Sequence, residues 1–257
     1  MIIVHASRYP DQGTISLYNS IKTELSVGER CYFVVPSQYT VEAEKNIMEY
    51  FDTDILFDIQ VKSFRSLENE ILDAGYGLKQ KRLSEAGRLI ALKLILEDKD
   101  NDWKIFSKSV RKTGFLKYIA GDLKEYKEYG ITPEKLESIA ETIEDASHTK
   151  EKLLELSKIY DQYEKRIDGK FLDDDDVFNL SISQIKELDI FNDVVFFFDK
   201  FHSMSKLELD AVEALSNIGC KVNIAITIDG KIADGIYNDD SNREYWNKYA
   251  DLEVTDA

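Results

Sequence analysis

Cysteine, proline, histidine and glycine are all scarce in this sequence. Its 257 residues include two cysteines, three prolines, three histidines and twelve glycines, whereas 32% of the residues are charged. This balance is typical of helix-rich globular proteins rather than of β-sandwiches or disordered tails. The three histidines lie far apart and lack a ligand spacing such as H-E-x-x-H, so we expect no metal site and no hydrolytic site built on them.

The two cysteines are too few for a disulfide framework. Cys31 and Cys220 each stand at the start of a strand-like apolar run, which predicts buried free thiols rather than a disulfide and suits a reducing cytoplasm. No apolar stretch approaches the roughly 20 residues that span a bilayer, and the start Met-Ile-Ile-Val-His lacks the basic flank of a signal peptide. We therefore expect a cytoplasmic protein without a membrane partner.

Positive charge is also in short supply. Lysine and arginine together number 33, aspartate and glutamate 49, and the formal net charge is −16. Because DNA is held chiefly by basic side chains that neutralise its phosphates, any DNA contact is expected to be local or shared with another protein. The 43% of apolar residues are enough for a substantial core, in one large domain or two modest ones.

Short apolar, β-rich runs alternate with helical patterns in the first and last parts of the chain. The strand-like runs are residues 2–5, 31–35, 59–61, 193–198 and 221–228. The helical patterns that follow four of them are residues 14–26, 40–50, 64–74 and 205–217. Runs that are apolar on both faces are typical of buried parallel strands, so we predict an α/β fold with a doubly wound parallel sheet.

More than a hundred residues between the third and fourth strands show helical spacing and almost no strand pattern. The clearest helix is predicted for residues 149–167, a second for 115–129, and a third starts at Thr132 with Pro133 at its first position. We therefore predict two parts. Residues 1–80 and 185–257 would form the α/β domain, and residues 81–184 an inserted helical subdomain.

The segment after the first strand, residues 5–14, is where a phosphate-binding loop would lie. Gly13 stands where such a loop has its lysine, Pro10 removes a backbone N–H, and Thr14 is left as a hydroxyl that could hold Mg²⁺. After the fourth strand, Asp199 has the position of a Walker B acid, but Lys200 follows it where hydrolysis needs a second acid. Thr14 and Asp199 are thus interpreted as a nucleotide-binding remnant. An ordinary strand with a surface aspartate at its end is the alternative for Asp199.

Several segments in succession resemble one protein family. Phe33 to Thr40 resembles the "F-V-P-D-Q-x-T" segment of AddB/RexB proteins, and Gln60 to Leu67 resembles their "Q-V-x-S-F-x-x-L", itself similar to a T-F-H-S motif of UvrD-like superfamily 1 helicases. Phe198 to Glu208 resembles "V-D-G-F-x-x-F-T-P-Q-E", related to the helicase D-E-x-Q-D motif. The insertion adds further similar segments, at residues 114–126, 156–160 and 171–178.

This resemblance implies a RecA-like fold of the superfamily 1 helicase type and an AddA/RexA-type partner subunit. It also implies contact with single-stranded DNA or a duplex end, and scanning for the recombination hotspot Chi. The parent complex would be an ATP-dependent helicase and exonuclease that processes double-strand breaks. Proteins of the AddB family are much longer, so the chain is expected to be an amino-terminal fragment, inactive by itself. No catalytic residue and no cofactor is expected in it, with Mg-ATP as the one candidate cofactor.

The helicase DNA-contact motifs align with four residues of this chain. Gln38 and Tyr39 follow the second strand, and Ser63 and Phe64 follow the third. A hydrogen bond to DNA or stacking on a base is one interpretation of these residues. Helix capping by Ser63, a core position for Phe64 and surface positions for Gln38 and Tyr39 are the alternatives.

The run of four acids from Asp173 to Asp176 precedes a predicted helix. We interpret it as a solvated helix start, where acids favour the positive end of the helix dipole, rather than as a metal site. For the whole chain, three hypotheses stay open. They are a catalytically degenerate helicase-like module, an unconventional ATPase that uses Thr14 and Asp199 with a lysine supplied from elsewhere, and a stand-alone protein-interaction domain.

Overall fold

The computed structural model describes residues 1–7, 9–53, 57–107, 109, 112–143, 148–227 and 253–256. Contacts divide the chain into two compact units. The α/β unit contains the described residues within 1–75, 181–204 and 208–257, and the helical unit those within 76–180 and 205–207. The end of the predicted strand 221–228 and most of the tail of the predicted domain 185–257 lie outside the described residues.

The α/β unit is built on a parallel sheet in the strand order β3-β2-β6-β7-β1-β8. Every neighbouring pair in it is parallel. Its strands are β1 (Ile2–Ser7), β2 (Arg30–Val34), β3 (Ile59–Lys62), β6 (Val194–Phe198), β7 (Val222–Thr227) and β8 (Glu253–Asp256). The five predicted strands are therefore confirmed, with ends that differ by one or two residues over the described part of the chain.

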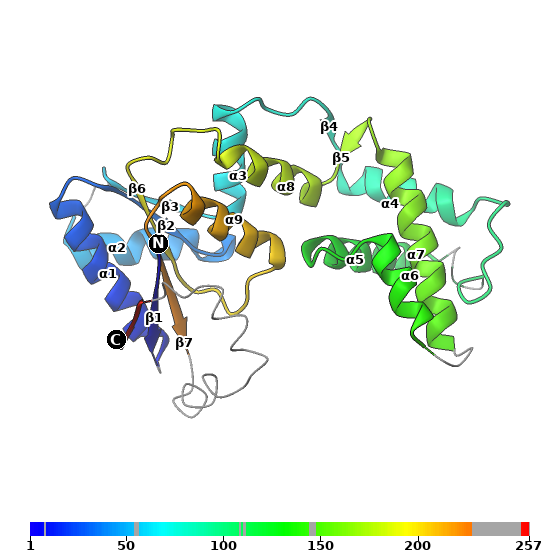
Figure 1. The fold of residues 1–257 in the computed structure, drawn as a ribbon, viewed down its shortest axis with the longest axis horizontal. Helices are drawn as coiled ribbons and strands as arrows, with labels where there is room; N and C mark the ends of the chain where they lie inside the picture. Colours follow the sequence, from blue (N-terminus) through cyan, green and yellow to red (C-terminus); the bar gives the residue numbers. More distant parts are fainter. Residues whose placement is uncertain are drawn as a thin grey trace. The chain divides into compact units, whose positions relative to one another are not determined.

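Helices cover both faces of this sheet, as Figure 1 shows. On one face, α1 (Pro10–Ser26) and α2 (Thr40–Phe51) pack with Phe33 and Phe197. On the other face, α3 (Phe64–Ala74) and α9 (Lys206–Asn217) pack with Phe196 and Phe198. Successive residues of β6 thus enter opposite cores because side chains alternate along a strand. The doubly wound α/β fold predicted from the sequence is confirmed.

The start of α1 differs from the prediction. The helix begins at Pro10, four residues before the expected Thr14, with Pro10 in the first turn and Asp11 beside it. Proline needs no hydrogen-bond partner for its nitrogen there, and an acid is favourable at the positive end of a helix. Pro10 and Asp11 are thus helix-start signals, in a segment whose position after β1 is also that of a phosphate-binding loop.

The helical unit has its own core. It contains α4 (Glu85–Leu96), α5 (Thr113–Glu128), α6 (Pro133–Glu141), α7 (His148–Ile167) and the start of α8 (Asp174–Ile185). The stripe predicted on α7 is buried at Leu156, Tyr160, Tyr163 and Ile167, and Thr132 caps α6 as predicted. Two strands of two residues each, β4 (Lys81–Arg82) and β5 (Phe171–Leu172), pair in parallel and were not expected. They are too short to produce a period in the sequence.

The acidic run at the start of α8 is solvated only in part, which corrects the prediction. Asp174, Asp175 and Asp176 do lie in the first helical turn, but Asp173 is only 1% exposed and Asp175 8%. Lys127 reaches them from α5, with its Nζ 2.7 Å from Oδ2 of Asp173 and 2.9 Å from Oδ1 of Asp176. The buried Asp173 and the half-buried Asp176 are therefore held around a buried cation.

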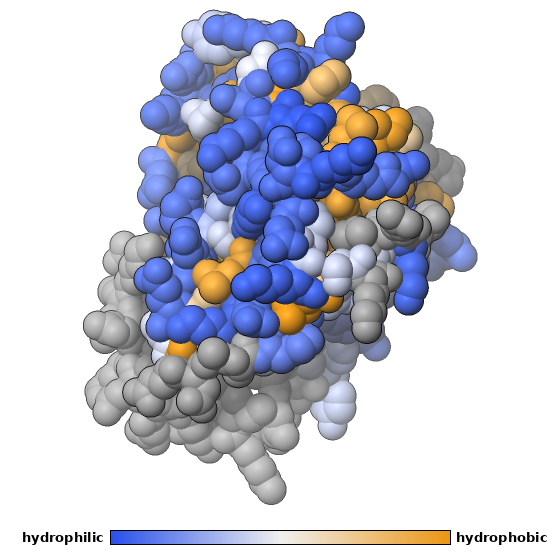
Figure 2. All heavy atoms as spheres, turned by 90° about the vertical axis from the view of Figure 1, so that its right-hand side faces the viewer, coloured by the Kyte–Doolittle hydropathy of each residue, from blue (hydrophilic) through white to orange (hydrophobic). Residues whose placement is uncertain are grey.

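The surface is mostly polar, in keeping with the charge content. Figure 2 shows a face on which hydrophilic side chains predominate and hydrophobic ones gather in small areas. Among the helices that the structure describes, none is long and apolar enough to cross a membrane. Cys31 and Cys220 are both buried and free, as predicted.

Candidate functional site

The carboxyl ends of the parallel strands lie at one edge of the sheet. At this edge, the chain leaves the neighbouring strands β2 and β6 towards opposite faces of the sheet. After β2 the chain continues into α2 on one face, and after β6 it continues into α9 on the other face. In open parallel sheets, the loops on either side of such a switch point separate and leave a crevice where ligands bind. The candidate site lies at this point.

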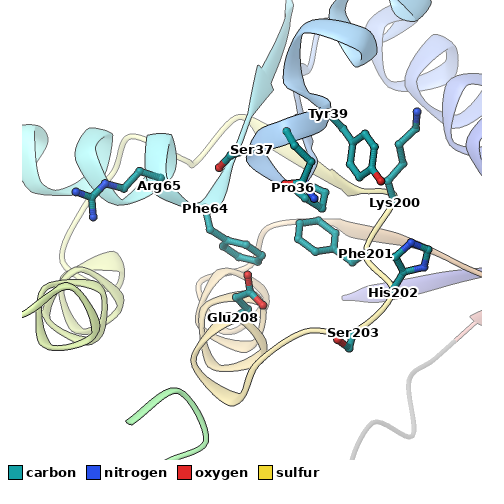
Figure 3. Close-up of a pocket in the computed structure, with 11 residues that line it drawn as sticks. Pro36, Ser37, Tyr39, Phe64, Arg65, Lys200, Phe201, His202, Ser203 and Glu208 are labelled. Carbon is teal, nitrogen blue, oxygen red and sulfur yellow. The ribbon is translucent and has the colours of Figure 1, made fainter. Parts of the chain in front are cut away.

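A pocket of about 410 Å³ opens at the carboxyl ends of β3, β2 and β6 (Figure 3). Its wall comes from the segments that follow these three strands and from α9. The lining residues are Pro36, Ser37, Gln38, Tyr39, Phe64, Arg65, Lys200, Phe201, His202, Ser203 and Glu208. All of them belong to the α/β unit. Three of the four predicted DNA-contact residues, Gln38, Tyr39 and Phe64, are thereby brought to one pocket.

Aromatic rings form the apolar part of the wall. The ring centroid of Phe64 lies 5.7 Å from that of Phe198 and 5.4 Å from that of Phe201. The position of Phe64 is fixed by Ser63, whose hydroxyl accepts the backbone N–H of Ser66 and caps α3. Ser63 is buried and has the capping role that was the alternative to a DNA contact. Phe64 is half-buried, so part of its ring faces the pocket.

Polar groups complete the wall. Gln38 is exposed, and Tyr39 is half-buried next to it in a short 3-10 turn, Ser37–Tyr39. Figure 3 shows the Glu208 carboxylate pointing from α9 towards the Phe64 ring, whereas the Arg65 side chain extends away from the pocket centre. The pocket thus offers flat apolar surfaces beside hydrogen-bonding groups.

Lys200 connects the two sides of the switch point. Its Nζ lies 2.7 Å from Oε1 of Glu42 in α2 and 5.4 Å from the centroid of the Tyr39 ring. The hydrogen bond from Lys200 lowers the pKa of the Glu42 carboxyl below its usual value. The backbone of Lys200 has φ 63°, in the left-handed region that favours glycine.

Thr14 and Asp199 are in direct contact. Oγ1 of Thr14 donates a hydrogen bond of 2.7 Å to Oδ2 of Asp199, and the backbone N–H of Lys200 donates one of 2.9 Å to Oδ1. Asp199 is buried, so it is not the surface aspartate of an ordinary strand end. Burial raises the pKa of Asp199, although the hydrogen bonds from Thr14 and Lys200 act in the opposite direction.

The space around Gly13 is filled by protein. β1 ends at Ser7 and α1 begins at Pro10, so Gly13 lies within the helix rather than in a loop. A Cβ atom on Gly13 would be 3.2 Å from both the Cβ of Ala225 and the Oγ of Ser7. The glycine therefore serves the close packing of α1 on β1 and β7. Its backbone is part of α1, whereas a phosphate-binding loop surrounds the phosphate with backbone N–H groups of a loop.

Two further observations concern residues outside the pocket. His5 is buried, with Nδ1 2.8 Å from Oγ of Ser16 and Nε2 3.1 Å from Oδ1 of Asn223, so it is a satisfied core histidine. No group of three or more His, Cys, Asp or Glu side chains in the described ranges is arranged to hold a metal ion.

Sequence reasoning missed several residues that line the pocket. Arg65, Phe201 and Glu208 line the pocket and lie within the segments that resemble the family, but no role was predicted for any of them. Arg65 follows the end of β3 by three residues and Phe201 follows the end of β6 by three, whereas Glu208 lies within α9, ten residues after the end of β6. For Arg65 and Phe201, the short distance from a strand end was therefore the signal that could have identified them.

Comparisons with known proteins agree with these motifs. The family described as "ADDB, N-terminal" matches residues 12–253. A Clostridium botulinum (strain Loch Maree) protein, named as a subunit of an "ATP-dependent helicase/deoxyribonuclease", is 30% identical over 82% of this chain. Proteins of the same name from Thermoanaerobacter sp. and Acetivibrio thermocellus are 31% and 28% identical over 80% of it. The chain spans 18% of the length of each of these relatives.

Proposed function

The chain belongs to the AddB amino-terminal family, and from this premise we propose that it is a catalytically degenerate helicase-like module that binds single-stranded DNA in its pocket. The module would act within a helicase-nuclease that processes DNA double-strand breaks. The relatives are named as subunits, which supports the presence of a partner, and we propose that this partner is of the AddA type. Scanning for Chi is part of the same proposal.

The arrangement of the pocket is the observation that carries this proposal. A base could stack on the rings of Phe64, Phe201 or Tyr39, because every base has a flat π-face, and such stacking contributes about 1 to 3 kcal/mol per base. Gln38 and Glu208 could hydrogen-bond to base edges, as an amide and a carboxylate respectively. The pocket lies at the switch point of the sheet, where ligands of open α/β folds bind.

The net charge of −16 limits what kind of DNA binding the module can have. Phosphate neutralisation by many lysines and arginines would produce a steep loss of affinity with salt. Among the described residues, Arg65 and Lys200 are the lysine and arginine side chains that line this pocket, and Lys200 is paired with Glu42. We therefore expect binding that depends mainly on stacking and only weakly on salt, with further phosphate contacts provided by the partner.

We also propose that the chain neither binds nor hydrolyses ATP. The packing of Gly13 against Ala225 and Ser7 supports this, as does Lys200 at the position of the second acid. The second candidate function, an unconventional ATPase, is favoured by the proximity of Thr14 and Asp199, which is what a shared Mg²⁺ site would need. It would still require a lysine from another protein or segment.

Fluorescence anisotropy with a labelled single-stranded oligonucleotide tests the proposed DNA binding. Phe64→Leu keeps an apolar side chain in the wall but removes the ring, and we expect about tenfold weaker binding. Gln38→Ala is expected to weaken binding about threefold, because it removes one exposed hydrogen-bonding group. Circular dichroism would check that both variants remain folded.

Phe57→Leu is the matched control. Phe57 is 79% exposed and precedes β3, whereas Phe64 follows the same strand. It lies towards the opposite end of that strand, so its removal should leave the affinity unchanged. The proposal is wrong if the wild-type chain shows no binding at about 100 µM, the weak end of non-specific DNA affinities, or if Phe57→Leu weakens binding as much as Phe64→Leu.

A further inference from the structure

Lys200 stands where a working helicase would have its second acid, and its contacts give it another role. We propose that Lys200 is a positioning residue, and that the Thr14, Asp199 and Lys200 contacts form a latch that holds Tyr39 in the pocket. This inference rests on the proposed DNA binding. It assigns to the remnant of the nucleotide site a function that needs no nucleotide.

The first part of the latch fixes the backbone. Lys200 adopts φ 63°, a conformation that costs a lysine more than a glycine or an asparagine. Asp199 accepts the N–H of Lys200 with one carboxylate oxygen and the hydroxyl of Thr14 with the other. The buried carboxylate therefore ties the turn after β6 to α1, and this turn determines where the lysine side chain begins.

The second part of the latch reaches across the switch point. Lys200 extends from the β6 side, and its ammonium group meets the Glu42 carboxylate and the face of the Tyr39 ring on the β2 side. The two loops diverge at this point, because α2 and α9 cover opposite faces of the sheet. The lysine thus joins the loop after β6 to the loop after β2, and both loops line the pocket (Figure 3).

A direct contact between Lys200 and a DNA phosphate would predict different behaviour. Glu42 distinguishes a phosphate contact from a latch. Its carboxylate would compete with a DNA phosphate for the Lys200 ammonium group, whereas a latch requires the ion pair between them. Removing the Glu42 charge should strengthen DNA binding if Lys200 contacts phosphate. It should weaken DNA binding if the ion pair positions Tyr39.

The variants are compared by anisotropy titration with the same oligonucleotide at several salt concentrations. We expect Lys200→Met to bind about fivefold more weakly with an unchanged salt dependence, Glu42→Gln about threefold more weakly, and Lys200→Arg close to wild type. Lys45→Met is the control, because it removes an exposed lysine that is paired with Glu49 in the same helix as Glu42. Tighter binding by Glu42→Gln, or a smaller salt dependence for Lys200→Met, would overturn the latch.

Hydrogen exchange of the DNA-free chain separates this inference from the proposed function. In Lys200→Met and Glu42→Gln, the amides of residues 37–43 should exchange faster than in wild type, whereas those of β6 should not change. Lys45→Met should leave both segments unchanged. If wild type fails to bind DNA but this exchange pattern appears, the proposed function fails and the latch stands. If residues 37–43 keep wild-type exchange in Lys200→Met, the latch is refuted.

Discussion

The hydroxyl of Thr14 lies 2.7 Å from a carboxylate oxygen of Asp199, although the two residues are 185 positions apart in the sequence. They follow β1 and β6, which are separated in the sheet by β7 alone. Both residues therefore stand at the same edge of the sheet, as a helicase would need for a nucleotide and its metal ion. Here the hydroxyl donates a hydrogen bond directly to the carboxylate.

Thr14→Val tests how much this hydrogen bond stabilises the fold. The change keeps the shape of the side chain but leaves one oxygen of the buried Asp199 without its donor, so we expect the free energy of unfolding to fall by about 1 to 2 kcal/mol. Urea denaturation followed by circular dichroism measures this. Thr23→Val is the control, since Thr23 is exposed on the same helix and bonds only a backbone carbonyl. Equal losses in the two variants would contradict the expectation.

Calorimetric titration with Mg-ATP tests the proposed loss of nucleotide binding. We expect no heat of binding up to about millimolar ATP, for the wild-type chain as for a Thr14→Ala, Asp199→Ala double variant. The reason is that the backbone around Gly13 is helical and packed against β1 and β7. Micromolar binding by wild type that disappears in the double variant would instead support the unconventional ATPase.

The sheet and its helices could be predicted because their signals are local. Apolar runs such as Val194 to Phe198 and the stripe of α7 indicate strands and helices by their own periods. The prediction for the start of α1 was wrong, because the expected phosphate-binding loop placed the start at Thr14, whereas Pro10 and Asp11 are local signals for an earlier start. The roles of Gln38, Tyr39 and Phe64 in DNA binding stay predictions, although one pocket gathers the three side chains.

Contacts between side chains that are far apart in the sequence could not be predicted. Asp173 and Asp176 resemble an ordinary solvated helix start until Lys127, 46 and 49 residues away, is placed between them. Glu208 likewise reaches the pocket only because α9 and α3 cover the same face of the sheet. No spacing in the chain encodes such contacts, since they depend on how separate helices pack.

Lys127→Met tests the buried ion cluster of the helical unit. Burial alone would lower the pKa of Lys127, but the charges of Asp173, Glu164 and Asp176 raise it above its usual value. Without the cation, buried carboxylates stay unpaired at neutral pH, so we expect a loss of about 3 to 5 kcal/mol in the free energy of unfolding. Lys165→Met removes an exposed lysine paired with Asp161 and should cost less than about 1 kcal/mol.

Denaturant unfolding of both variants at neutral pH, where ordinary carboxylates are ionised, gives the comparison. A loss for Lys127→Met as small as that for Lys165→Met would show that the buried cluster is not held by its central cation. Thermal unfolding of the same samples would provide a second measure of which variant is less stable.

Asp175 differs from its neighbours because one of its oxygens is unsatisfied. Oδ2 is buried and has no hydrogen-bond partner among the described residues. Burial, followed by the charges of Asp173 and Glu128, raises the pKa of Asp175 to about 7, against the opposing effects of Arg88 and Lys124. An acid whose pKa is higher in the folded state stabilises the fold when protonated, and this contribution is lost as the pH rises through the folded-state value.

Asp175→Asn removes the ionisation and should therefore stabilise the chain at pH 8 relative to pH 5. From pH 5 to pH 8, we expect the unfolding free energy of the variant to rise relative to that of wild type by about 1 to 2 kcal/mol, a value reduced for solvent screening. Urea denaturation at the two pH values measures it. Asp174→Asn is the control, because it removes a charge from the same helical turn at a side chain that is 52% exposed. Its effect should be similar at both pH values, because this substitution removes no buried charge. A parallel shift for both variants would mean that the helix dipole, rather than the buried charge of Asp175, determines the pH dependence.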